Sequence, residues 1–216
     1  MGDDKKYKLI IFDLDGTLVN SVQLARVSFL KLLQVRGIKV KNFDIGPLSG
    51  SPTVGILKFM KKKYGLKGNL MDLRNERRRH FFEMIKSKNL LFPGVENTLK
   101  KLKKKYKIAV ATGSSYGTMS QILPKKIMKL FNVIVTIDDV KEGKPNPEQL
   151  ILILKKLKIN SKKCLMIGDS RFDQIAAKRA GMDSIGVLTG GTKRKDLLKA
   201  GAKEVIENVN KLNKVI

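Results

Sequence analysis

The sequence predicts an α/β fold, in which a parallel sheet forms the core and a small α-helical domain is inserted after the first strand. Short apolar runs alternate with stretches of helical spacing, and this alternation is typical of a parallel sheet. One long stretch breaks the alternation and carries helical spacing alone. The chain has 216 residues, of which 42% are hydrophobic and 30% charged, a balance that supports a sizeable buried core.

Five apolar runs are expected to be strands, because each is short and ends in a polar turn. The first covers residues 7–12 and stops at the turn that begins with Asp13. The remaining four cover residues 107–111, 133–137, 163–167 and 183–188.

Helices are expected between these strands, over residues 95–106, 147–157 and 172–180. The last of them stops at Gly181, a residue that commonly ends helices. Between the first two strands, helical spacing covers residues 22–36, 53–64 and 71–88 without a convincing strand. We therefore expect residues 21–91 to form the helical domain, and residues 1–20 and 92–216 to form the core.

Carboxylates gather at the expected ends of two strands. Asp13 and Asp15 follow the first strand, and Asp169 and Asp173 follow the fourth. Because ligands of open parallel sheets bind beyond the carboxyl ends of the strands, these side chains are expected to converge. Neighbouring carboxylates repel one another unless a cation lies near them. Oxygen ligands suit Mg²⁺, which is therefore the expected cofactor.

Groups suited to phosphate follow other strand ends. Thr112 supplies a hydroxyl, and Gly113 and Ser114 add backbone N–H groups near an expected helix start, a combination that binds phosphate. Lys144 adds a positive charge. An aspartate nucleophile, a metal, a lysine, a hydroxyl and backbone amides together indicate phosphoryl transfer, in which positioning and neutralising oxygen charge dominate.

Four segments resemble, in order, the four signatures of the haloacid dehalogenase (HAD) superfamily. Asp-Leu-Asp-Gly-Thr-Leu at 13–18 resembles the first, Thr-Gly-Ser at 112–114 the second, and Gly-Lys-Pro-Asn-Pro at 143–147 the third; Gly-Asp-Ser at 168–170, with Asp173, resembles the fourth. The resemblance covers nearly the whole chain and implies the Rossmann-like HAD fold. It also makes the helical domain similar to the cap of phosphoglycolate phosphatases and β-phosphoglucomutases.

The resemblance implies a role for each matching residue. Asp13 attacks phosphorus to give an aspartyl phosphate, and Asp15 protonates the leaving group and then activates the hydrolytic water. Thr112 and Lys144 bind the phosphoryl oxygens, and Asp173 orients Lys144 or a metal-bound water. Such an enzyme is a phosphatase acting on a small-molecule phosphate ester, with phosphoglycolate or a sugar phosphate as the first substrates to consider.

The resemblance also implies how Mg²⁺ is held, namely by the carboxylates of Asp13 and Asp169 and the backbone carbonyl of Asp15. Superfamily members that cleave carbon–halogen bonds lack a carboxylate two residues after the nucleophile, so Asp15 favours phosphate chemistry. In β-phosphoglucomutases a cap histidine gates proton transfer, and an ungapped alignment places Ala25 there. Hydrolysis is therefore favoured over a sugar-phosphate mutase, and a cap lysine acting as in phosphonate-cleaving relatives stays open.

The net charge of the chain is +26, and the segment 21–91 carries 16 Lys and Arg against 4 Asp and Glu. Lysine-rich solvated helix faces are the first interpretation, and attraction of an anionic substrate is the second. A nucleic-acid-binding protein that retains the fold is a third. It is disfavoured because Lys greatly outnumbers Arg, Trp is absent and aromatic residues make up 6%, which leaves no stacking platform.

The remaining features are ordinary for a cytoplasmic enzyme. The apolar runs are too short to cross a bilayer, and the N-terminus lacks the pattern of a signal peptide. The single cysteine, Cys164, fits a reducing compartment and is expected to pack in the core, while His80 is expected on a solvated helix surface. We expect a monomer or a homodimer with no membrane partner.

Overall fold

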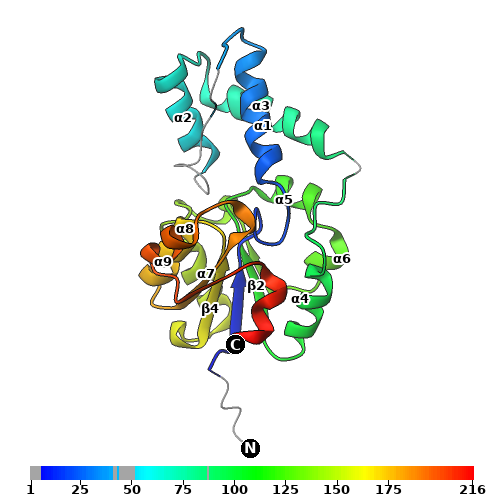
Figure 1. The fold of residues 1–216 in the computed structure, drawn as a ribbon, viewed down its shortest axis with the longest axis vertical. Helices are drawn as coiled ribbons and strands as arrows, with labels where there is room; N and C mark the ends of the chain where they lie inside the picture. The colour runs from blue at the N-terminus through cyan, green and yellow to red at the C-terminus, as the bar shows by residue number, and fades with distance from the viewer. Residues whose placement is uncertain (1–5, 41–42, 44–51, 87) are drawn as a thin grey trace, which may run out of the picture.

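The structure is a computed structural model that describes residues 6–40, 43, 52–86 and 88–216. A six-stranded parallel sheet with strand order β3-β2-β1-β4-β5-β6 runs through the molecule (Figure 1). This arrangement confirms the predicted α/β class. Residues 1–5, 41–42, 44–51 and 87 belong to segments named above and lie outside the described residues.

The central strand is β1, which lies between β2 and β4. Phe12 at its end is opposite Val110 of β2 and Ile167 of β4. All four residues of β1 are buried, as expected for a strand covered on both faces. The register brings the residues that follow β1, β2 and β4 to the same edge of the sheet. The strands are β1 (Leu9–Phe12), β2 (Lys107–Ala111), β3 (Val133–Val135), β4 (Cys164–Gly168), β5 (Asp183–Val187) and β6 (Glu204–Ile206).

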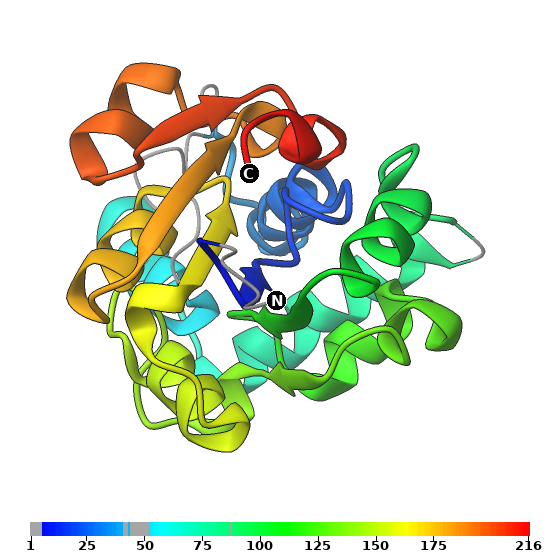
Figure 2. The ribbon, with the colours of Figure 1, turned by 90° about the horizontal axis from the view of Figure 1, so that it is seen from below.

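Helices cover both faces of the sheet (Figure 2). Ile10 and Phe12 pack in the cluster that contains α4 and η5, whereas Leu9 and Ile11 pack against α7 and α8. The α-helices are α1 (Val22–Gln34), α2 (Thr53–Tyr64), α3 (Leu70–Ile85), α4 (Val95–Lys103), α5 (Tyr116–Ile122), α6 (Lys125–Met128), α7 (Glu148–Leu157), α8 (Arg171–Arg179) and α9 (Arg194–Ala200). Short 3-10 helices are η2 (Ile137–Asp139), η3 (Ser161–Lys163), η4 (Leu188–Gly190) and η5 (Val209–Lys214).

Helices α1, α2 and α3 lie beyond the carboxyl edge of the sheet (Figure 1). They share an apolar cluster of their own, which includes Phe29, Leu57 and Leu73. The chain enters and leaves this segment side by side, since the N–H of Phe92 donates to the carbonyl of Leu18 at 3.0 Å. Among the described residues, we find no helix with both the length and the apolar content needed to cross a membrane.

Several elements differ from the sequence-based expectation. The strand expected over 133–137 ends at Val135 because Thr136 caps η2: its Oγ accepts from the N–H of Asp138 at 3.3 Å, and its N–H donates to Asp139 at 2.7 Å. The helices expected over 95–106 and 71–88 are shorter at their C-terminal ends. Helix α5 begins near the helix start expected after Ser114, whereas strand β6 and helices α6 and α9 were not predicted.

Candidate active site

Asp13 is the first residue after β1 and is 7% exposed. Its N–H donates to the carbonyl of Ile167 at 2.8 Å, so the pairing of β1 with β4 continues to this residue. The chain then turns at Gly16, whose φ of +80° favours glycine. A Cβ at Gly16 would lie 2.7 Å from Oδ2 of Asp169. The glycine therefore lets the turn after β1 approach the end of β4.

Lys144 joins residues from three strand ends. Its Nζ donates to Oδ1 of Asp13 at 2.7 Å, to Oδ1 of Asp173 at 2.6 Å and to the carbonyl of Ala111 at 2.8 Å. These three acceptors use all the ammonium protons. Burial by itself lowers the pKa of Lys144, but the charges of the two carboxylates outweigh burial and raise this pKa overall. Lys144 is thus a fixed positive charge beside Asp13.

The carboxylates at this edge outnumber the cations that face them. Burial raises the pKa of Asp13 to about 7, although Lys144 opposes this shift; the charges of Asp173 and Asp15 add to it. Burial also raises the pKa of Asp169 well above its usual value, and repulsion from Asp13 and Asp173 adds to the effect. Lys144 alone does not offset the charge of three buried carboxylates.

This charge balance fits a divalent cation. Asp13, Asp169 and Asp173 each offer a carboxylate oxygen, and the three oxygens lie within 4.8 Å of one another. Asp169 accepts a hydrogen bond from the Thr17 hydroxyl at 3.2 Å. Mg²⁺ prefers oxygen ligands and binds through one or two carboxylates, so the donor set and the excess negative charge both suit it.

Asp15 is held outside this cluster by two hydroxyls. Ser21 Oγ donates to its Oδ1 at 2.5 Å, and Ser114 Oγ donates to its Oδ2 at 2.8 Å. The structure therefore brings Asp15 together with Ser114, as expected, and adds Ser21. Sequence reasoning missed Ser21, although it stands directly before α1, where a serine normally caps the helix. Its side chain makes no such cap.

The turn after β2 carries Thr112, Gly113 and Ser114. Thr112 is fully buried, and its Oγ accepts from the N–H of Ser114 at 3.0 Å. This hydrogen bond shapes the turn, and the binding of phosphate by the Gly113 and Ser114 amides stays a prediction. The Thr112 hydroxyl keeps its proton for another acceptor. Gln149 of α7, which sequence reasoning also missed, donates to the carbonyl of Thr112 at 2.7 Å and holds the turn in place.

Asp173 performs two structural tasks at once. Its Oδ2 accepts from the N–H and the hydroxyl of Ser170, at 3.0 and 2.6 Å, which caps α8. Its Oδ1 accepts from Lys144. One carboxylate therefore both caps α8 and holds Lys144.

Two residues of the sequence analysis lie elsewhere. Cys164 is buried in β4, and burial raises the pKa of its thiol to about 12. His80 was expected to be solvated, but its side chain is 14% exposed. Its ring nitrogens lie 3.8 Å from Glu76 and 3.7 Å from Glu83 on α3. That expectation is wrong because the imidazole is mostly covered and lies between Glu76 and Glu83 of its own helix.

Comparison with known proteins gives consistent results. The chain is 30% identical over 211 residues to a phosphorylated carbohydrates phosphatase of Thermotoga maritima, covering 94% of this chain and 96% of that protein. It is 31% identical over 185 residues to the pyrophosphatase PpaX of Bacillus mycoides, covering 84% of each. Its fold is similar to that of a β-phosphoglucomutase from Clostridium difficile, with a TM-score of 0.78 and 25% identity over 95% of this chain and 93% of that one.

A match to a whole protein family agrees with the similarity to these individual proteins. The haloacid dehalogenase-like hydrolase family matches residues 10–187, which include both carboxylate-bearing strand ends and the turn after β2. The structure also has the parallel sheet that the signatures imply. The chain belongs to the haloacid dehalogenase-like hydrolase family.

Proposed function

We propose that this chain is a Mg²⁺-dependent phosphatase that hydrolyses a small phosphorylated metabolite through an aspartyl phosphate formed on Asp13. The observation that carries the proposal is the buried Asp13 carboxylate, paired with Lys144 at 2.7 Å and adjoining Asp169 at the edge of the sheet. A carboxylate fixed beside a lysine is suited to attack phosphorus while the lysine balances the phosphoryl charge. Thr112, with Gly113 and Ser114, lines the same edge.

The proposed reaction has two steps, phosphorylation of Asp13 and hydrolysis of the aspartyl phosphate. A carboxylate oxygen of Asp13 attacks phosphorus, the bond from phosphorus to the ester oxygen breaks, and Asp15 gives its proton to the departing alcohol. Asp15, now ionised, takes a proton from water as the water oxygen attacks the aspartyl phosphate. Inorganic phosphate leaves, and Asp13 returns as a carboxylate. Ser21 and Ser114 keep Asp15 oriented through both steps.

Asp13 and Asp169 hold Mg²⁺ in this proposal through their carboxylates, and Asp15 through its backbone carbonyl. When bound, the metal supplies positive charge that favours the ionised form of Asp13 and offsets charge on the phosphoryl oxygens. Asp173 supports the site by holding Lys144. Residues 21–91 act as a cap domain over the core formed by 1–20 and 92–216, and exclude bulk water during the reaction.

The names of the relatives support phosphate-ester or pyrophosphate hydrolysis. A β-phosphoglucomutase among the structural neighbours makes a sugar-phosphate mutase the second candidate. Ala25 stands on α1, at the position where mutases carry the histidine that gates proton transfer. An alanine side chain cannot carry a proton, and this favours transfer of the phosphoryl group to water.

The test measures phosphate release from a panel of small phosphate esters, with Mg²⁺ or with EDTA. We expect release with Mg²⁺ only, and we expect Asp13→Asn to lose it while the variant stays folded, as shown by a cooperative thermal transition. The matched control is Asp72→Asn, which changes an exposed aspartate of α3. Activity of Asp13→Asn near the wild-type level refutes the nucleophile. Conversion of a sugar phosphate to its isomer, without phosphate release, identifies a mutase.

A further inference from the structure

A small cavity lies between α3 and the turn after β2, with a volume of about 110 Å³. Three arginines line it from α3, and Ser114 lines it from the sheet side. Ser114 also donates to Asp15, so the cavity adjoins the group that transfers protons in the proposed reaction. The arginines are Arg74, Arg77 and Arg78.

Arg77 is held rigidly within this wall. It is 9% exposed, and its guanidinium carbon lies 4.7 Å from the ring centroid of Phe29 and 4.9 Å from that of Phe81. Its Nε donates to Ser28 Oγ at 2.7 Å. The stacking and the hydrogen bond fix the plane of the guanidinium group, and no hydrogen bond of its two Nη groups to another described residue competes with a ligand.

Among the described residues, Arg77 forms no ion pair with a carboxylate. Within the described ranges of the chain, no ion pair joins a carboxylate to any of the three cavity arginines, whereas Arg36 in the same helical segment forms a two-pronged pair with Glu76. Burial lowers the pKa of Arg77 to about 10, and the charge of Asp15 partly opposes this. A buried cation without a paired anion is costly, and a bound anion recovers that cost.

We propose that Arg77, with Arg74 and Arg78 beside it, binds a second anionic group of the substrate, either a carboxylate or a second phosphate. The proposal rests on the proposed function, in which the transferred phosphate lies at Asp13. A guanidinium group binds either anion through two parallel N–H bonds. Because Ser114 both lines the cavity and donates to Asp15, the second anion lies close to the reacting phosphate. The substrate class is therefore a short phosphate compound with two anionic ends, and Arg77 is a specificity-determining residue.

The experiment compares kcat/KM, with saturating Mg²⁺, for three compounds. Phosphoglycolate offers a carboxylate, inorganic pyrophosphate offers a second phosphate, and glycerol 2-phosphate has an uncharged remainder. We expect Arg77→Met to lower kcat/KM for one or both doubly anionic compounds about 30-fold more than for glycerol 2-phosphate, mainly through KM. The compound that loses most identifies the second anion as carboxylate or phosphate.

Matched variants separate this effect from loss of charge and from misfolding. Arg79→Met removes the same charge from an exposed position of α3 that does not line the cavity, and we expect it to keep the wild-type ratio between substrates. Arg77→Lys restores the charge without the two-pronged geometry, and we expect it to recover part of the ratio. If Arg77→Met does not fold, Arg74→Met and Arg78→Met test the half-buried rim of the cavity, with expected changes in the ratio of about 3-fold or more.

Equal losses on all three compounds overturn the subsite, because they mean that Arg77 acts through the fold or through Asp15. If the wild type hydrolyses none of them, the panel of phosphate esters described above decides the proposed function separately. The subsite is then tested by calorimetric binding of phosphoglycolate and pyrophosphate to Asp13→Asn, with and without Arg77→Met. Binding at least about tenfold weaker in the double variant supports the subsite, and equal binding refutes it.

Discussion

At the residue scale, the buried cation Lys144 pairs with two carboxylates. It stands between Asp13 and Asp173 and is 5% exposed. We expect Lys144→Met to lower kcat/KM on the order of 10² or more, because phosphoryl charge is left unbalanced. Phosphate release measures this. The control Lys100→Met removes an exposed lysine that pairs with Glu96 at 2.8 Å, and wild-type kinetics in Lys144→Met would remove Lys144 from the site.

Asp169 is the residue at which metal binding is best tested without an activity assay. Because burial and neighbouring carboxylates oppose its ionised form, Asp169→Asn removes repulsion in EDTA but also removes a metal ligand. We expect Mg²⁺ to raise the unfolding temperature of the wild type by several degrees, and to leave Asp169→Asn almost unchanged. Thermal unfolding with and without Mg²⁺ is the measurement. An equal Mg²⁺ shift in both proteins means that the metal binds elsewhere.

The site residues that could be predicted from the sequence lie in motifs at strand ends, and the residues that were missed do not. Asp13 and Lys144 stand out because motif spacing and strand ends mark them. Gln149 and Ser21 carry no such mark, since each acts by one hydrogen bond to a neighbouring segment. Arg77 looked like any other member of a basic run in the sequence. Phe81 lies one turn further along the same helix, but the contact with Phe29 of α1 depends on tertiary packing, which no local pattern reveals.

At the element scale, the long buried strands were the easiest to predict. Strand β2 has the bounds that its apolar run indicates, and α2 has the bounds of its helical spacing. Strand β6 has three residues and begins with an exposed glutamate, so it lacks an apolar run. Helix α6 has four residues and begins directly after Pro124. Such short elements form because neighbouring elements hold them, and local propensity alone does not indicate them.

An ion pair between Arg36, just after α1, and Glu76 of α3 gives a prediction about stability and pH. Arg36 donates to both carboxylate oxygens of Glu76, at 2.8 and 2.5 Å, and these hydrogen bonds lower the pKa of Glu76 even though burial opposes the shift. A carboxyl whose pKa falls on folding stabilises the fold above its unfolded pKa of about 4.3, and this stability is lost as the pH falls through the folded value. The stabilisation is therefore complete at neutral pH and disappears in acid.

We expect Glu76→Gln to lower the free energy of unfolding by about 1 kcal/mol at pH 7. The difference from the wild type should shrink as the pH is lowered from about 7 toward 3. Denaturant unfolding at a series of pH values measures both effects. Glu83→Gln on the same helix is the control, because Glu83 is 62% exposed in its pair with Lys31 and its loss should matter less. A difference that stays constant with pH contradicts the role of the charge.

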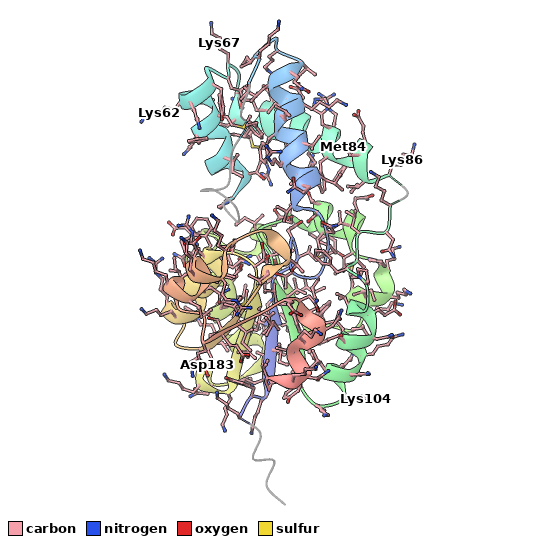
Figure 3. The ribbon with its side chains drawn as sticks, in the orientation of Figure 1. Lys62, Lys67, Met84, Lys86, Lys104 and Asp183 are labelled. Carbon is pink, nitrogen blue, oxygen red and sulfur yellow. The ribbon has the colours of Figure 1, made fainter. Side chains whose placement is uncertain are left out.

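At the scale of the whole molecule, the net charge of +26 is spread over both the helical segment and the core. Figure 3 shows Lys67 at the far end of the helical segment, Lys62 at its side, and Lys104 at the opposite end of the molecule. All three are exposed. Lysines so far from the candidate site cannot contact a substrate there, so any effect on catalysis acts through the summed field. If the lysines attract an anionic substrate, kcat/KM depends on salt. If they only form solvated helix faces, kcat/KM does not depend on salt.

Raising NaCl from about 20 to 300 mM shortens the screening length from roughly 20 Å to about 6 Å. If the summed field attracts an anionic substrate, kcat/KM falls several-fold while kcat holds, because salt then affects encounter and not chemistry. Mg²⁺ is kept saturating, since salt also weakens metal binding. We expect Lys62→Glu with Lys67→Glu to reduce the slope of log kcat/KM against salt, and Lys104→Glu to reduce it less, because Lys104 lies at the end away from the site. A kcat/KM that does not change with salt means that the lysines serve only as solvated helix faces.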